Sequence, residues 1–139
     1  MIRITAGQLF VSKDDTITTL VACCGSLVLW DTVEKIGGLN HYQFPYQNKR
    51  GYDSSTYLNE MLIMILKDFN CKNLVGRLYG CACKTDTIKE LTEKNIEVGL
   101  KALKKHDIPL IEKDTGGAKY RNIKFNCLTG EVIVKFIKE

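Results

Sequence analysis

The sequence lacks an apolar run long enough to cross a bilayer, and its first residues lack the charged, apolar and small-residue succession of a signal peptide. It also lacks repeats, low-complexity segments and linkers rich in proline and glycine, with only two prolines in 139 residues. No stripe of interleaved aromatic and basic residues indicates nucleic-acid binding. These absences favour one cytoplasmic domain spanning residues 1–139.

Cysteine, in contrast, occurs six times. In a reducing cytoplasm an even cysteine count does not indicate disulfides, so we interpret these residues as buried thiols, catalytic thiols or metal ligands. Hydrophobic residues make up 45% of the chain and charged residues 26%, with a net charge of +4. These values are ordinary for a soluble globular protein, and the chain is long enough to form a core without metal or disulfide support.

Hydrophobic periodicity predicts two amphipathic helices. The first spans 53–69 and is capped by Asp53 or Ser54. The second spans 87–106 and opens with "TIKE", a capping box. Its buried side is marked by Leu91, Ile96, Leu100 and Leu103. Strands are expected over 2–11, 17–21, 25–31, 37–45, 73–80, 108–112, 122–127 and 131–137, the last two forming a hairpin. The pattern predicts an α+β fold, a layered α/β sandwich with mostly antiparallel or mixed sheets.

Two adjacent thiols, Cys23 and Cys24, stand just before the apolar strand over 25–31. Neighbours on an extended chain face opposite sides, so one thiol should pack in the core while the other can be exposed. The strands over 25–31 and 37–45 should form an antiparallel hairpin that brings Cys24 opposite His41. A thiol beside an imidazole is the geometry of a cysteine nucleophile and its base, and an imidazolium lowers the pKa of a neighbouring thiol.

A third group should orient the imidazole. The candidates are the upstream threonines Thr16, Thr18 and Thr19, with the carboxylates Asp14, Asp15 and Asp31 as alternatives. Ordinary core packing is the alternative interpretation of both thiols, because free cysteine is among the most buried residue types. The chain's other histidine, His106, is expected at a helix end, where it interacts with the helix dipole.

A metal site is a further alternative for the thiols. Cys81 and Cys83 form a Cys-x-Cys pair, to which four other cysteines could add ligands: Cys23, Cys24, Cys71 and Cys127. On a strand, however, Cys-x-Cys places both thiols on one face, as buried packing also does. Structural zinc sites usually contain two Cys-x2-4-Cys pairs, which this chain does not have. The spacing therefore favours packing over zinc.

The segments "TTLVACCGSLVLWD", "GGLNHYQFP", "NLVGRLYGCA" and "EKNIEVGLKALKKHDIPLIEKDTGGAKYRNIKFNCLTGEVIVK" resemble, in this order, the CheD family of chemoreceptor glutamine deamidases. The resemblance runs from about Gly7 to Lys135. It implies that Cys24 is the nucleophile, His41 the general base and acid, and Thr18 the residue that orients His41. It also implies a pocket or supporting role for Cys23, Glu93, Asn95, Asp114, Gly116, Gly117 and Arg121. A structural role is the alternative, because an Asp-x-Gly-Gly segment commonly makes a turn and a buried Asn commonly satisfies backbone groups.

Several positions depart from the family pattern. Ala22-Cys23 replaces Gly-Ser before the nucleophile, and Gly80-Cys81-Ala82 replaces Gly-Gly-Ala. Arg77 replaces a lysine, and Asn40 replaces an alanine before the histidine. Alanine does not adopt the positive φ open to glycine, so the backbone beside the nucleophile can differ in shape.

The resemblance implies conversion of glutamines on the cytoplasmic helices of chemotaxis receptors to glutamate through a thioester, without a metal or organic cofactor. The same groups would hydrolyse glutamate methyl esters. It also implies a CheC-type phosphatase as a partner that covers the mouth of the site. The alternative is a chemotaxis adaptor of the same fold that binds receptors or the phosphatase with weak or no catalysis, because function is carried by the site and not by the fold.

Overall fold

The structure is a computed structural model, in which residues 1–47, 49–50 and 53–137 are described. These residues form two α-helices, α1 (Ser54–Asp68) and α2 (Lys89–Lys105), and a short 3-10 turn, η1 (Asp86–Ile88). Their strands are β1 (Ile2–Arg3), β2 (Leu9–Ser12), β3 (Thr16–Val21), β4 (Gly25–Asp31), β5 (Gly37–Asn40), β6 (Leu74–Gly80), β7 (Leu110–Thr115), β8 (Arg121–Asn126) and β9 (Val132–Phe136).

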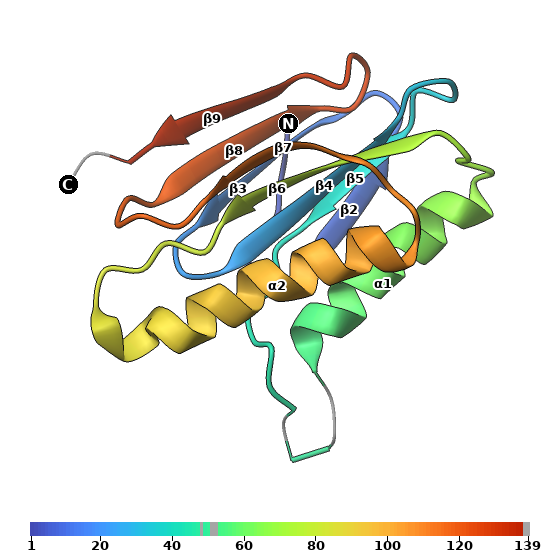
Figure 1. The fold of residues 1–139 in the computed structure, drawn as a ribbon. Coiled ribbons are helices and arrows are strands. Elements are labelled where there is room, and N and C mark those ends of the chain that lie inside the picture. Colours follow the sequence, from blue (N-terminus) through green and yellow to red (C-terminus); the bar gives the residue numbers. More distant parts are fainter. Residues whose placement is uncertain (48, 51–52, 138–139) are drawn as a thin grey trace.

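The strands form two sheets, one with the order β1-β3-β8-β9 and one with the order β2-β5-β4-β6-β7. Both helices lie along one face of the five-stranded sheet, and the four-stranded sheet covers its other face (Figure 1). The pairs β1–β3 and β6–β7 are parallel, whereas the other described pairs are antiparallel. The predicted α+β fold with mixed sheets is confirmed.

Strand β4 lies at the centre of the molecule and shows why there are two cores. Leu27 and Leu29 pack toward the helices, while Val28 between them packs toward the second sheet with Leu39 and Phe125. Alternate residues of a strand face opposite sides, so a strand covered on both faces becomes apolar throughout. The run "SLVLW" therefore supplies both cores.

Helix α1 begins as predicted. The Asp53 carboxylate accepts hydrogen bonds from the backbone N–H of Ser55 (3.1 Å) and of Thr56 (3.2 Å). Such a cap satisfies two of the amides that the first helical turn leaves unpaired. The helix buries Leu58, Leu62, Ile63 and Leu66 against the five-stranded sheet.

Helix α2 differs from its prediction in two respects. The capping box is wrong, because η1 precedes the helix and the cap residue Ile88 makes no side-chain capping bond. The buried face is also displaced. Leu91, Ile96 and Leu100 are only half-buried, whereas the buried residues are Thr92, Asn95, Gly99, Ala102 and Leu103. A Cβ at Gly99 would lie 2.7 Å from Leu78 Cδ1. The helix therefore approaches the sheet most closely through the face that carries Gly99.

Three strand boundaries also differ. The predicted strand over 2–11 is divided by a turn in which the Gln8 amide donates to Thr5 O (3.1 Å). The strand predicted over 37–45 pairs only as far as Asn40, with one isolated bridge at Tyr42. Strand β7 extends beyond the predicted 108–112 because it follows β6 in parallel. The terminal hairpin, formed by β8 and β9, is confirmed.

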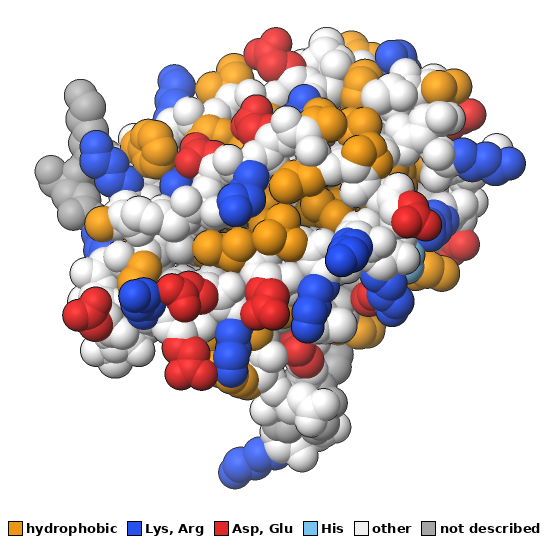
Figure 2. Space-filling model, in the orientation of Figure 1, with side chains coloured by type: hydrophobic (Ala, Val, Ile, Leu, Met, Phe, Trp, Pro, Cys, Tyr) orange, Lys and Arg blue, Asp and Glu red, His pale blue; other side chains and the backbone are white. Residues whose placement is uncertain are grey.

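The surface over α2 is charged with both signs, as Figure 2 shows. Within that helix Lys94 pairs with Glu90 (3.2 Å) and Lys101 with Glu97 (3.9 Å), the spacing at which side chains are neighbours on a helix. Neither described helix is long and apolar enough to span a membrane. The polar face of α2 is therefore the solvent face of the helix layer.

Candidate active site

The residue after Cys24 and the residue after His41 are paired directly. The amide of Gly25 donates to Tyr42 O (3.0 Å), and the amide of Tyr42 donates to Gly25 O (2.9 Å). This bridge continues the β4–β5 register, which places His41 opposite Ser26 and Cys24 two residues away on the diagonal. The predicted register is thus displaced by two residues, a shift that leaves each residue on its original side of the sheet. Cys24 and His41 lie at one end of the central sheet as diagonal neighbours, a position from which side chains reach each other.

The hydrogen bonds of His41 define its tautomer. The Thr19 hydroxyl donates to Ile4 O (2.9 Å) and lies 2.8 Å from His41 Nδ1. A hydroxyl has one proton, so with that proton on Ile4 O it accepts from Nδ1–H. The proton of the neutral ring is then on Nδ1, and Nε2 keeps its lone pair. His41 is therefore oriented as a base.

The threonine that contacts the His41 ring is Thr19, whereas the family resemblance implied Thr18. The Thr18 hydroxyl instead donates to Ile123 O (2.9 Å) in the neighbouring strand β8. The reason is the two-residue period of β3, in which Ile17 and Val21 are fully buried and Thr19 lies between them on the same face. That alternation was the signal in the sequence that would have selected Thr19.

The alternative carboxylates lie elsewhere. The Ser12 hydroxyl donates to Asp15 (2.8 Å) and approaches Asp14 (3.4 Å) in the turn before β3. Asp31 stands at the opposite end of β4 from the thiols, and its carboxylate accepts the amides of Val33 and Glu34 at 2.9 and 2.7 Å. These carboxylates stabilise turns and do not contact the imidazole.

The two candidate catalytic groups are both neutral at pH 7. Burial raises the pKa of the Cys24 thiol to about 12, with a further contribution from Cys23. Burial lowers the pKa of the His41 imidazole to about 4. The expected lowering of the thiol pKa by an imidazolium is therefore wrong for the unbound protein. A thiol and a free imidazole react by passing the proton to nitrogen as sulfur attacks.

The backbone around the nucleophile is held through its carbonyls. Cys24 O accepts from the amide of Cys81 (2.8 Å), and Cys23 O accepts from the side-chain amide of Asn95 (3.3 Å). The N–H groups of Cys23 and Cys24 have no hydrogen-bond acceptor among the described residues. Glu93, two residues earlier on α2, is exposed and takes no part in these contacts. Unpaired amides beside a half-buried thiol are the donors that a developing oxyanion requires.

The glycine-rich loop at Gly116 and Gly117 supports the end of β6, which lies next to Cys24. Arg121 is buried, and its guanidinium donates to Asp114 (3.0 Å), to Gly116 O (3.0 Å) and to Gly80 O (3.4 Å). The amide of Gly116 also donates to Gly80 O (2.9 Å), while Gly116 and Gly117 turn the chain with positive φ. These contacts hold the end of β6 beside the nucleophile. The geometry of this loop is that of a structural turn.

A tyrosine next to His41 completes the neighbourhood. Tyr42 is fully buried, and a Cβ at Gly25 would lie 2.4 Å from its ring. Its hydroxyl donates to Asn95 O (2.7 Å). Tyr42 is not among the site residues predicted from the sequence. The signal available was a glycine after the candidate nucleophile and an aromatic residue after the candidate base, at positions that pair.

The remaining candidates are dispersed. Cys83 donates its thiol proton to Thr85 O (3.1 Å), and Cys71 and Cys127 are buried. Among the described residues no group of three or more His, Cys, Asp or Glu side chains is arranged to hold a metal ion. His106 is the C-cap residue of α2, at the helix end as expected, and its Nε2 lies 2.5 Å from Glu60 of α1. It joins the two helices.

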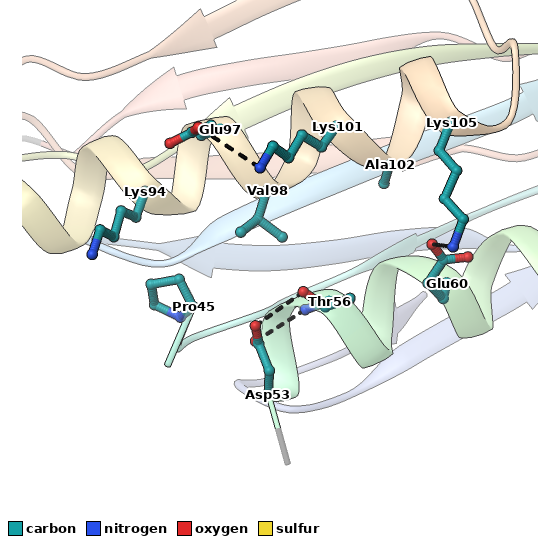
Figure 3. A pocket seen from close by; sticks show the side chains of 10 residues that line it. All are labelled: Pro45, Asp53, Thr56, Glu60, Lys94, Glu97, Val98, Lys101, Ala102 and Lys105. Atoms are coloured by element: carbon teal, nitrogen blue, oxygen red, sulfur yellow. Dashed lines mark hydrogen bonds and ion pairs between the residues drawn. The ribbon is translucent and has the colours of Figure 1, made fainter. Parts of the chain in front are cut away.

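A groove of about 530 Å³ lies between α1 and α2 (Figure 3). Its walls carry Lys94, Lys101, Lys105, Glu60 and Glu97, with the apolar Val98 and Ala102 between them. None of the described residues that line it has a thiol or an imidazole. The groove is therefore separate from the catalytic candidates, which lie at the strand ends.

Comparison with known proteins places the chain in a family. The family described as CheD chemotactic sensory transduction matches residues 50–136. A probable chemoreceptor glutamine deamidase CheD of Sulfurimonas denitrificans is 29% identical, covering 98% of this chain and 94% of that protein. Those of Caldanaerobacter subterraneus subsp. tengcongensis and Pyrococcus horikoshii are 32% and 28% identical, each covering 99% of this chain and 93% of the relative. The chain therefore belongs to the CheD family.

Proposed function

We propose that this chain is a cytoplasmic protein-glutamine deamidase that acts on chemoreceptors. The observation that carries the proposal is the hydrogen-bond chain from Ile4 O through Thr19 to His41, which leaves Nε2 unprotonated on a residue that is the diagonal neighbour of Cys24 in the sheet register. The names of the relatives support the substrate class. In this proposal Thr19 takes the role that the resemblance assigned to Thr18.

The reaction begins with attack of the Cys24 sulfur on the carboxamide carbon of a glutamine. His41 Nε2 accepts the thiol proton as the S–C bond forms, because neither group is charged beforehand. The imidazolium that results donates its Nδ1 proton to Thr19, which holds the ring in place. The unpaired amides of Cys23 and Cys24 receive the oxyanion, and each donor of this kind contributes about 2.7–4 kcal/mol.

Collapse of the tetrahedral intermediate breaks the C–N bond. His41 returns the proton to the leaving nitrogen, ammonia departs, and a thioester remains on Cys24. Water, deprotonated by the same imidazole, then hydrolyses the thioester to glutamate and regenerates the thiol. A glutamate methyl ester would follow the same course with methanol as the leaving group, so esterase activity forms part of the proposal.

The partners follow from the position of the thiol. Cys24 is half-buried at strand ends, where a glutamine side chain projecting from another protein reaches it. Phe44 and Tyr46, which follow His41 in the chain, are 53% and 46% exposed. We assign these aromatic side chains to contact with the cytoplasmic helices of a receptor, since exposed aromatics are common at protein interfaces. A CheC-type phosphatase, implied by the family resemblance, would cover the same mouth.

The test is mass spectrometry of a receptor cytoplasmic fragment after incubation with wild type, Cys24→Ala, His41→Asn and Cys23→Ser. Conversion of amide to acid by wild type and Cys23→Ser, with loss in the other two variants, supports the proposal. A thioester trapped at low pH should map to Cys24. Binding of the fragment by every variant without conversion would reject the deamidase function and favour a non-catalytic adaptor.

A further inference from the structure

One buried amide connects the segment of the nucleophile with the segment of the base. Asn95 Nδ2 donates to Cys23 O (3.3 Å) and to Gln43 O (2.8 Å). Cys23 directly precedes Cys24, and Gln43 lies two residues after His41. Asn95 therefore bridges two segments that come from different parts of the chain and carry the two reacting groups.

The orientation of this amide is determined by its acceptors. Both neighbours are carbonyl oxygens, so the side chain must present its NH₂ group to them. As a result Asn95 Oδ1 is buried and has no hydrogen-bond partner among the described residues. An unpaired buried oxygen is unfavourable and rare in folded proteins, so its presence indicates that the two donated bonds matter at this position.

Tyr42 also connects helix α2 with the two segments that carry Cys24 and His41. Its hydroxyl donates to the backbone oxygen of Asn95 (2.7 Å), and its amide and carbonyl bond to Gly25. The ring occupies space that a side chain at Gly25 would fill, and a Cβ at Gly99 would lie 2.8 Å from the hydroxyl. These contacts thus fix the distance between helix α2 and the Gly25–Tyr42 bridge, which joins the two segments.

We propose that Asn95 and Tyr42, here called the Asn95–Tyr42 clamp, are positioning residues that set the distance between the Cys24 sulfur and the His41 imidazole. Neither residue exchanges a proton with the substrate in this proposal. Without the Asn95 side chain, the backbone at Cys23 and the backbone at Gln43 lose their common hydrogen-bond donor. Each of the two segments can then move without the other. The inference rests on the proposed function, because it assigns these residues to the geometry of that reaction.

The test compares Asn95→Ala with Thr92→Ala. Thr92 lies one turn earlier on the same helix face, is equally buried, and bonds only to Lys89 O within its own helix. We expect Asn95→Ala to lower kcat for glutamine conversion by about 10- to 100-fold with KM little changed, since small misplacements of reacting groups have effects of this size. Thr92→Ala should stay within about twofold of wild type, because its bond does not reach the catalytic segments. Tyr42→Phe, which removes only the hydroxyl, should fall between the two and serves if Asn95→Ala does not fold.

A second readout does not depend on deamidase activity. Iodoacetamide labelling, mapped by peptide mass spectrometry, should be faster at Cys24 in Asn95→Ala because the thiol segment is released, while the buried Cys71 and Cys127 stay protected. Faster labelling of Cys24 alone, with slower turnover, supports the clamp. A kcat within twofold of Thr92→Ala, or equal gains in labelling at the two buried thiols, would overturn it. If wild type does not deamidate, the proposed function fails and the labelling pattern alone decides on the clamp.

Discussion

Acidification should destabilise this protein through one residue, His41. Its pKa is about 4 in the folded chain against an ordinary value of 6.5, because burial disfavours the charged ring. Between these two pH values the unfolded chain binds a proton that the folded chain does not, so the free energy of unfolding falls as the pH falls. Each tenfold difference in proton affinity corresponds to about 1.4 kcal/mol, which gives a loss of about 2 kcal/mol at pH 5 and about 3 kcal/mol below pH 4.

The assay is urea unfolding followed by circular dichroism at several pH values from 7.5 to 5. His41→Asn removes the titrating ring and keeps an N–H donor for the Thr19 hydroxyl, so its free energy of unfolding should depend on pH less steeply than that of wild type. The gap between the two proteins should change by about 2 kcal/mol over this range. His106→Asn is the matched control, because it removes the chain's other imidazole and leaves His41 in place. Parallel curves for wild type and His41→Asn would show that the ring titrates normally and would refute the description of a buried, neutral base.

Three further predictions concern single contacts. Thr19→Val should lower kcat for glutamine conversion by about 10- to 100-fold, because His41 loses the contact that orients it as a base. Thr18→Val should keep kcat within about twofold of wild type. Equal effects of the two substitutions in a deamidation assay would contradict the assigned tautomer. Gly25→Ala should destabilise the protein by about 1–3 kcal/mol in urea, because the added methyl collides with the Tyr42 ring; an unchanged unfolding midpoint would show that the ring is free to move. Arg121→Met should cost about 1–3 kcal/mol, because Gly116 O and the Asp114 carboxylate lose the guanidinium that donates to them. Denaturant titration measures this loss, and a variant as stable as wild type would disprove it.

The sequence was sufficient for the elements with strong periodicity. The compact apolar run over 25–31 and the broad apolar face over 53–69 predicted β4 and α1 closely, since each element buries large apolar side chains. The antiparallel hairpin that brings the segments of Cys24 and His41 to one end of the sheet was also predicted. Its register was displaced by two residues, because turn geometry was not available from the sequence.

The parts that failed depend on contacts between distant segments. The buried face of α2 is determined by the close packing of Tyr42 against Gly99. A hydrophobicity pattern carries no information about such packing. Thr18 and Thr19 are chemically identical, and only the burial of Ile17 and Val21 in a second sheet separates them. The neutral thiol and imidazole depend on burial from several layers, which a local pattern does not measure.

The packing of Tyr42 between Gly25 and Gly99 has a consequence for how this chain can change in evolution. A side chain larger than hydrogen at either glycine position collides with the tyrosine, so neither glycine is free to vary while the tyrosine is present. Related chains that carry a larger residue at one of these positions should also carry a smaller residue in place of the tyrosine. Positions 25, 42 and 99 should therefore vary together. A larger residue at position 99 of helix α2 requires a smaller residue at position 42, which is next to the candidate base.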